Sequence, residues 1–126
     1  MQIGWATPLF NANPVAGHGV GDDIHSWAYD GGRLQRWHAG GAPYSSLHWR
    51  TGDVVGCFLD VDSGTMHFSL NGRNLGVAFA NIHEDQNIES GGQPVHFVPA
   101  CSMEGGEQLE FKLARELELM FERVSA

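Results

Sequence analysis

Two adjacent acids, Asp22 and Asp23, come closest in this chain to a catalytic or metal-binding pair. Paired carboxylates can hold a metal ion or exchange protons with a substrate. Neighbours on an extended chain point in opposite directions, however, so these two carboxylates would rarely converge on one atom. Their glycine-rich surroundings favour side-chain hydrogen bonds to loop N–H groups. We therefore expect no catalysis here, and keep both acids only as candidates for binding a partner.

A second acidic pattern, Asp60-x-Asp62-x-Gly64, is similar to the start of a calcium-binding loop. An EF-hand loop needs glycine at its sixth position and a bidentate glutamate at its twelfth. Those positions hold Thr65 and Asn71. The segment therefore predicts a solvated turn between two strands and not a metal site.

Seven histidines and two cysteines complete the set of possible metal ligands. No two histidines have the i, i+4 spacing of a His-Glu-x-x-His helix, and two cysteines are too few for a structural zinc site without help from histidines. The chain also lacks the Gly-x-Ser-x-Gly pattern of many hydrolases, and the Gly17–Gly21 stretch lacks the lysine of a phosphate-binding loop. We expect no metal, no cofactor and no enzymatic activity.

Aromatic and arginine residues indicate a different chemistry, the binding of a protein or peptide. Trp37, Tyr44 and Trp49 flank or occupy a long connection without an apolar period. Exposed Trp, Tyr and Arg dominate the energetics of protein interfaces. Arg33 and Arg36 lie nearby, and a guanidinium can bind a carboxylate at two points. We predict that these five residues, with the two loop acids, include the partner-binding site, although packing in the core remains an equal alternative for the aromatic ones.

The elements that must position these residues are strands. Residues 52–72 contain two apolar-rich runs, Val54–Val61 and Thr65–Leu70, joined by Asp-Ser-Gly and followed by Asn71-Gly72. Glycine adopts positive φ without steric cost, and Asn and Asp tolerate it better than most residues. The pattern predicts a strand, a tight turn, a strand and a second tight turn.

The same reading extends over the chain. Strands are expected over residues 2–6, 26–29, 34–38, 54–61, 65–70, 75–80, 95–101 and 107–113. Side chains expected to face the core are Trp5, Trp27, Tyr29, Val55, Cys57, Leu59, Val61, Met66, Phe68 and Leu70. Long connections over residues 7–25, 39–53 and 81–94 are the places where recognition is expected.

The C-terminal tail has a different period. Leu113, Leu117, Met120, Phe121 and Val124 recur on one helical face, which predicts an amphipathic helix over 114–124. This helix could pack on the chain's own strands or bind a partner. We therefore divide the chain into residues 1–113 and a helical tail over 114–126.

Composition limits the class of protein. A chain of 126 residues suits one domain, and 17 glycines with 17% charged residues suit a β-protein with many turns. A net charge of −8 argues against nucleic acid or an anionic membrane as partner. No apolar run is long enough for a membrane span. Cys57 and Cys101 are expected to be buried free thiols, which favours a cytoplasmic setting.

Four blocks of the chain resemble one family in the correct order. They are Met1–Thr7 with Gly-Trp-Ala, Gly19–Asp23 with Ser26–Gly31, Gly52–Cys57 continuing to Phe79, and Phe97–Ser102. Together these blocks are similar to a SPRY (B30.2) domain over about residues 1–113. The Gly-x-Gly-Asp-Asp and Ala-Tyr-Asp-Gly blocks look most like SPRY modules of RING-type ubiquitin ligases, and Gln35–His38 is similar to SPRY domains of ryanodine-receptor channels.

The resemblance implies a concanavalin A-like antiparallel β-sandwich that binds a peptide or protein surface without catalysis. In many relatives such a module selects substrates for a ubiquitin ligase. Family members have strands before the Gly-Trp-Ala strand, so we expect an N-terminally truncated sandwich. A carbohydrate-binding, lectin-like domain and a structural segment of a large channel or scaffold remain the alternatives.

Overall fold

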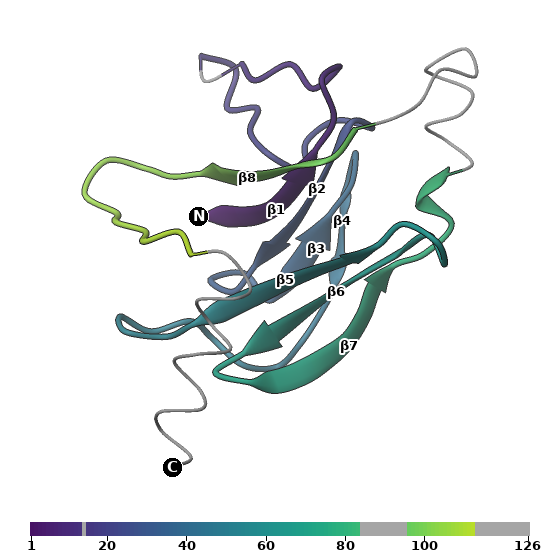
Figure 1. The fold of residues 1–126 in the computed structure, drawn as a ribbon. Helices are drawn as coiled ribbons and strands as arrows, with labels where there is room; N and C mark the ends of the chain where they lie inside the picture. The colour runs from purple at the N-terminus through teal and green to yellow at the C-terminus, as the bar shows by residue number, and fades with distance from the viewer. Residues whose placement is uncertain (14, 84–95, 113–126) are drawn as a thin grey trace.

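The fold is formed by strands in two sheets (Figure 1). The computed structural model describes residues 1–13, 15–83 and 96–112. Its strands are β1 (Gln2–Ala6), β2 (Ser26–Asp30), β3 (Gln35–Trp37), β4 (Gly41–Pro43), β5 (Val55–Asp60), β6 (Thr65–Leu70), β7 (Arg73–Phe79) and β8 (Val98–Ser102). Within the described ranges, no helix is long and apolar enough to cross a membrane.

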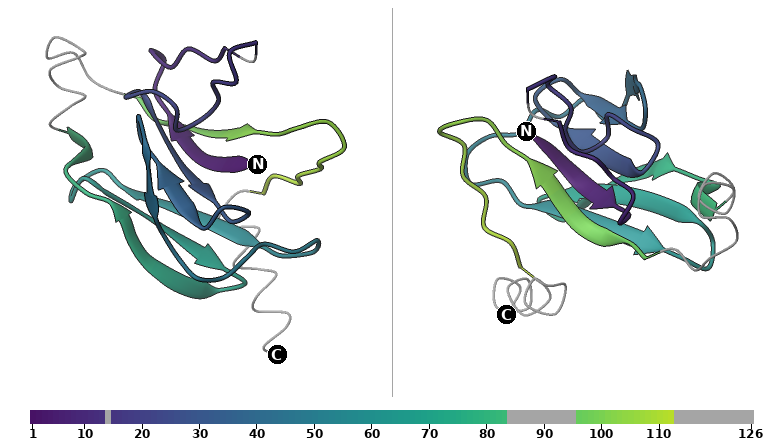
Figure 2. Two further views of the ribbon diagram at one scale, coloured as in Figure 1. Left: turned by 180° about the vertical axis from the view of Figure 1, so that it is seen from behind. Right: turned by 90° about the horizontal axis from the view of Figure 1, so that it is seen from above.

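The two sheets stack as the layers of a sandwich, as Figure 2 shows from two further sides. One sheet has five strands in the order β4-β3-β2-β1-β8, and the other has three in the order β5-β6-β7. Every pair of neighbouring strands is antiparallel. The predicted all-β antiparallel sandwich is therefore confirmed.

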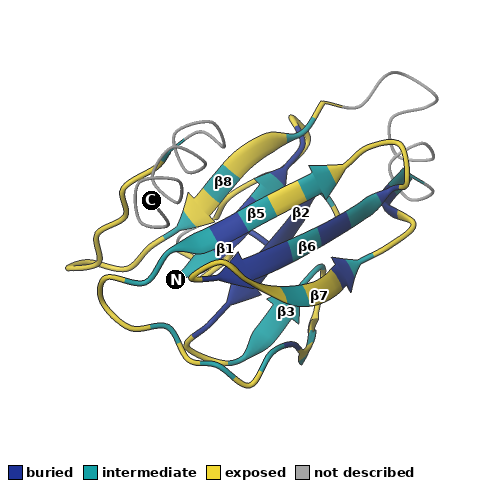
Figure 3. Cartoon of the chain, turned by 60° about the horizontal axis from the view of Figure 1, so that its bottom comes forward, coloured by how far each residue is buried: buried dark blue, intermediate teal, exposed yellow. Residues whose placement is uncertain are grey.

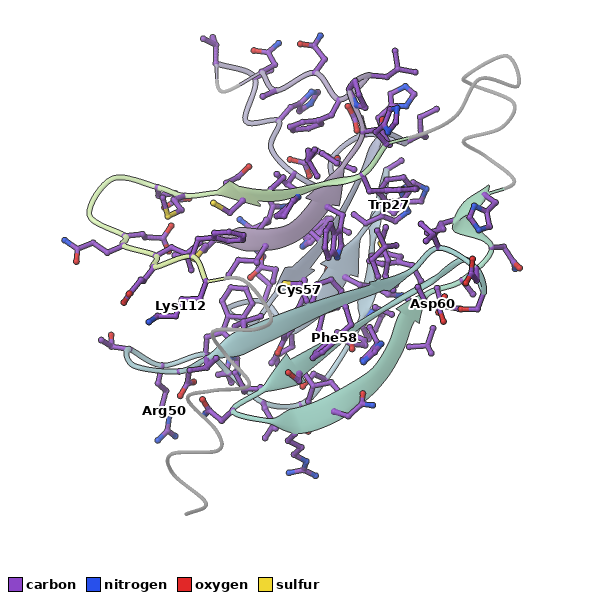
Figure 4. The ribbon with its side chains drawn as sticks, viewed as in Figure 1. Trp27, Arg50, Cys57, Phe58, Asp60 and Lys112 are labelled. Carbon is purple, nitrogen blue, oxygen red and sulfur yellow. The ribbon has the colours of Figure 1, made fainter. Side chains whose placement is uncertain are left out.

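The core lies between the central strands of the two sheets. Trp27 and Tyr29 on β2 are at most 1% exposed, and Met66 and Phe68 on β6 are fully buried. The rings of Tyr29 and Phe68 lie 5.5 Å apart. Figure 3 shows the buried residues concentrated on β2 and β6, and Figure 4 shows the side chains that fill the space between the sheets. The predicted core positions on these two strands are confirmed.

The small sheet is a meander whose two turns have the predicted chemistry. The Asp60 carboxylate accepts hydrogen bonds from the N–H groups of Asp62 and Ser63, which lower the pKa of Asp60. Gly64 has φ of 69°. In the second turn, Asn71 and Gly72 have φ of 52° and 81°. Both sharp reversals therefore use residues that tolerate the left-handed region.

Two of the expected elements differ from the structure, and a third lies outside the described residues. The connection over 39–53 contains the edge strand β4, which pairs with β3 through Ala42 opposite Arg36. The strand expected over 107–113 is wrong for residues 107–112, which form no ladder. The chain instead turns at Glu104, whose N–H donates to the Glu107 carboxylate. Residue 113 and the tail helix over 114–124 lie outside the described residues.

Two predicted burials are also wrong. Val61 follows the last residue of β5 and is 51% exposed, because the turn rather than the strand determines its direction. Cys101 is exposed on β8, the edge strand of the large sheet, whereas Cys57 is half-buried on β5. Both cysteines are free thiols. Alternation therefore fails at Val61 because the strand ends before it, and at Cys101 it does not tell whether another layer covers that part of the sheet.

Candidate functional site

The structure separates the seven residues predicted to bind a partner. The acids Asp22 and Asp23 lie in the 7–25 connection, and Arg33 and Trp37 lie on one side of the large sheet. The rings of Tyr44 and Trp49 pack around the core, and Arg36 lines a groove between the sheets. They therefore do not form one surface. Each group is described below by its contacts.

The two loop acids bond to the 7–25 segment itself. The Asp22 carboxylate accepts a hydrogen bond of 2.7 Å from the Gly19 N–H. Asp23 accepts bonds from the N–H groups of Asn11 and His25, and from the Ser26 hydroxyl at 2.9 Å. These bonds match the loop-stabilising role considered for both acids, because they fix the loop against the start of β2.

Tyr44 is buried in the core, and Trp49 is half-buried and packs against it. Tyr44 is 7% exposed, and its hydroxyl donates a 2.6 Å bond to the Gly76 carbonyl on β7. The same hydroxyl accepts a bond from the Phe68 N–H at 3.3 Å. Burial raises the pKa of the Tyr44 phenol. Trp49 packs edge-to-face on Tyr29, with ring centroids 4.9 Å apart.

Arg33 and Trp37 share the outer side of the large sheet. Arg36 points between the sheets, so Trp37, its neighbour on β3, points to the opposite side. The Arg33 guanidinium lies 5.8 Å from the Trp37 ring centroid and 3.6 Å from the Asp30 carboxylate. The indole N–H of Trp37 is buried and has no acceptor among the described residues. These two residues therefore offer a half-buried aromatic surface with one cation above it.

A groove lies between the large sheet and the end of β7. We call it the Arg36 groove; its volume is about 400 Å³, and it is lined by Trp27, Arg36, His38, Ala42, Phe79 and Ile82, with Gly40, Ala78, Ala80 and Asn81. A volume of 300–1,000 Å³ is usual for ligand sites in proteins. Most of these side chains are aromatic or aliphatic, but polar atoms contribute about half of the exposed lining.

The Arg36 guanidinium is held in the groove by the small sheet. Its Nη1 donates a hydrogen bond to the Ala78 carbonyl on β7. Among the described residues, no carboxylate forms an ion pair with Arg36. A half-buried cation with this arrangement is positioned to bind an anionic group that enters the groove.

Stacked rings form one wall of the groove. His38 lies parallel to Trp27, with centroids 4.8 Å apart and an angle of 9° between the planes. Its Nδ1 is 2.9 Å from the Ser26 carbonyl oxygen, and Phe79 lies edge-on at 6.1 Å. The sequence predicted Arg36 but missed His38, Phe79 and Ile82, because residues so far apart along the chain meet only after the sheets stack.

The described residues offer binding contacts rather than a reactive group. No set of three or more His, Cys, Asp or Glu residues is arranged there to hold a metal ion. Burial raises the pKa of the Cys57 thiol to about 12, which keeps this sulfur protonated and unreactive at neutral pH. The geometry therefore supports recognition through shape, aromatic surface and one cation.

The comparisons with known proteins agree with this class. A family model described as SPRY domain matches residues 1–116, and the chain belongs to this family. It is 37% identical over 110 residues to E3 ubiquitin-protein ligase RKP of Arabidopsis thaliana, covering 86% of this chain and 8% of that protein. It is 33% identical over 84 residues to Ran-binding protein 9 of Xenopus laevis, covering 65% of this chain and 14% of that protein.

The predicted family resemblance is confirmed by these matches. The chain spans about 8% and 14% of the length of the two relatives, so the activity of each whole protein does not transfer to it directly. SPRY domains are in general non-catalytic modules for protein interaction. Family membership supports this coarse function.

Proposed function

We propose that this chain binds a segment of a partner protein in the Arg36 groove. The observation that supports this function is the combination of volume, a lining that is part apolar and part polar, and a cation without a carboxylate partner in the described structure. A cavity of about 400 Å³ has room for a few side chains of a bound segment. Aromatic and arginine residues are also those that contribute most to the stability of protein complexes.

The test selects ligands and then blocks the groove. A library of peptides displayed on phage is panned on the purified chain, and enriched peptides are measured by fluorescence anisotropy. Ala80 is exposed and lines the groove, so Ala80→Trp places a large ring at its mouth. We expect Ala80→Trp to weaken binding at least about tenfold, which corresponds to about 1.4 kcal/mol.

The control makes the same change elsewhere. Ala16 is exposed in the 7–25 connection, and Ala16→Trp should leave the affinity within about twofold. Equal binding by both variants would show that the peptides use another surface, such as the Arg33 and Trp37 side of the large sheet. Failure to enrich any peptide would count against peptide recognition itself.

We further propose that the parent protein uses this module to present the bound protein for ubiquitin ligation. The support is the 37% identity over 110 residues to a protein described as an E3 ubiquitin-protein ligase. A photo-crosslinking amino acid in place of Ala80 in the full-length protein would identify the protein bound in the groove. Its ubiquitin conjugates should decrease in cells that produce the Ala80→Trp variant and remain normal with Ala16→Trp. Unchanged conjugates with a lost crosslink would reject the ubiquitin role and leave the binding role intact.

A further inference from the structure

We propose that the Arg36 groove selects segments in which an Asp or Glu lies beside an apolar residue, with the carboxylate bound by the Arg36 guanidinium. This inference rests on the proposed function, because it names the chemistry of the ligand for the same groove. It follows from the charge, the fixed orientation and the lining of the site.

The charge of Arg36 lacks compensation in the described structure. A guanidinium has five N–H donors, and one nitrogen of Arg36 donates to the Ala78 carbonyl. Asp30 lies opposite Gln35, the neighbour of Arg36 on β3, but its carboxylate already binds the N–H groups of Gly32 and Arg33. Withdrawing a cation from water costs free energy unless an anion compensates it. A ligand carboxylate supplies that compensation where the described protein residues do not.

The hydrogen bond to β7 also fixes how the guanidinium is presented. Arg36 comes from the large sheet, whereas the Ala78 carbonyl comes from the small sheet, so both sheets hold the side chain in place. A planar guanidinium that is already oriented can bind a carboxylate with two parallel hydrogen bonds. A lysine would present one mobile point charge instead. The site is therefore suited to a planar carboxylate.

The rest of the lining defines the neighbour of the acid. Trp27 and Ile82 are almost fully buried, so the accessible apolar surface of the groove comes from the half-buried Ala42 and Phe79 and the exposed Ala80. A ligand side chain against this surface gains about 25 cal/mol for each Å² of apolar surface removed from water. An acidic residue next to an aliphatic or aromatic residue fits both parts of the groove.

The source of the carboxylate is taken to be a side chain and not a chain end. The lining comes from β2, β3 and β4 on one side and from the end of β7 with residues 80–82 on the other, and we assign the carboxylate to a side chain of a segment that lies between them. A phosphate group is disfavoured, because its two charges would meet a chain of net charge −8 with only one cation in this groove. Ligands with a terminal carboxylate or a phosphoserine are outcomes that the experiment distinguishes.

The experiment is a double-mutant cycle between ligand and protein. A peptide enriched by panning is compared with its Glu→Gln or Asp→Asn form, which keeps the shape and removes the charge. Each form is measured by anisotropy on the wild-type chain and on Arg36→Gln and Arg36→Lys. We expect the neutral peptide to bind the wild type at least tenfold more weakly than the acidic peptide does. On Arg36→Gln, the affinities of the two peptides should differ by less than twofold. Arg36→Lys should show an intermediate loss, because it keeps the charge but not the planar fork.

A matched control and the fold of each variant complete the design. Arg73 is exposed on β7, and Arg73→Gln should keep the full tenfold discrimination between the two peptides. Since each ratio compares two peptides on one protein, a general loss of stability does not imitate the expected coupling. If Arg36→Gln does not fold, as judged by circular dichroism, the cycle with Arg36→Lys decides.

The outcomes separate the two proposals. If no peptide is enriched, or if Ala80→Trp binds normally, the proposed function fails and this inference fails with it. If Ala80→Trp blocks enriched peptides that contain no Asp or Glu, only the carboxylate inference is overturned. Equal discrimination by the wild type and Arg36→Gln would also overturn it, as would peptides that depend on a free C-terminus or a phosphate.

Discussion

Tyr44, just after β4, and Arg36, on β3, bond to carbonyls of β7 where its pairing with β6 is irregular. The Tyr44 hydroxyl donates to the Gly76 carbonyl, and Arg36 donates to the Ala78 carbonyl. The register of β6 against β7 shifts between Met66 and His67 and again between His67 and Ser69. The Tyr44 hydroxyl also accepts a bond from the Phe68 N–H on β6, so it bridges both strands at this irregularity. Tyr44 and Arg36 therefore join the two sheets where the ladder between β6 and β7 is interrupted.

We predict that Tyr44→Phe lowers the free energy of unfolding by about 1–3 kcal/mol, because the buried Phe68 N–H loses its acceptor and the Gly76 carbonyl loses its donor. Urea denaturation followed by tryptophan fluorescence measures this loss. The comparison is Tyr29→Phe, whose hydroxyl donates a longer bond of 3.5 Å to the Leu47 carbonyl and should matter less. Equal losses in the two variants would contradict a special role for the Tyr44 bond.

The Cys57 thiol predicts how stability depends on pH. Its pKa is about 12 in the folded chain and 9.0 for an ordinary thiol, since burial disfavours the thiolate. Above about pH 9 the unfolded chain loses this proton before the folded chain does. The contribution to stability is therefore complete below pH 9 and is lost as the pH rises toward 12. Urea denaturation at a series of pH values should show a flatter decline for Cys57→Ala; identical slopes would disprove this role.

At the scale of elements, turn residues determine the register of the small sheet. Asn71 has φ of 52°, and its side chain accepts a bond from the Val54 N–H and donates one to the Asp53 carboxylate. Those bonds join the second turn to the chain just before β5. The register then places Cys57 opposite Phe68 and Leu59 opposite Met66. A correct turn thereby directs the apolar residues of both strands to the core.

We predict that Gly72→Ala destabilises the chain by about 1–2 kcal/mol, because φ of 81° is strained for a residue with a Cβ. The matched control is Gly105→Ala, since the φ of Gly105 lies outside the left-handed region and an added Cβ would meet no atom within 4 Å. Thermal unfolding measured by circular dichroism should show a lower Tm for Gly72→Ala alone. A similar Tm for both variants would mean that the turn can relax.

The whole molecule combines a net charge of −8 with several exposed apolar side chains. Val98 on β8, together with Met103, Leu109 and Phe111 in the segment that follows, is between 42% and 63% exposed. Exposed apolar surface favours association, whereas like net charge opposes it. The balance between these two terms should depend on salt.

We predict that the isolated chain associates more strongly as the salt concentration rises from about 0.02 to 0.5 M, because screening weakens the repulsion between chains. Light scattering at fixed protein concentration measures the average mass. Phe111→Ser should reduce the increase, since Phe111 is 63% exposed. A mass that stays constant, or that falls with salt, would show that apolar association does not act through this surface.

The sequence by itself determined the family, the two-sheet architecture and most strands of the sandwich. Strand alternation, turn glycines and family blocks are local signals, so they survive without knowledge of long-range contacts. The same signals correctly placed Trp27, Tyr29, Met66 and Phe68 in the core. They could not distinguish a strand from an extended segment over 107–112, because a strand also needs a partner edge.

Only the tertiary structure decided which predicted binding residues can meet a partner. Tyr44 and Trp49 have interface-type side chains, but stacking of the sheets encloses them around Tyr29. Arg36 and Trp37 are adjacent in sequence, yet the alternation of β3 directs one into the groove and the other to the outer side. The groove itself combines Arg36 with Phe79 and Ile82, more than 40 residues later in the chain. Residue type is local and readable, whereas exposure and proximity exist only after distant strands have packed.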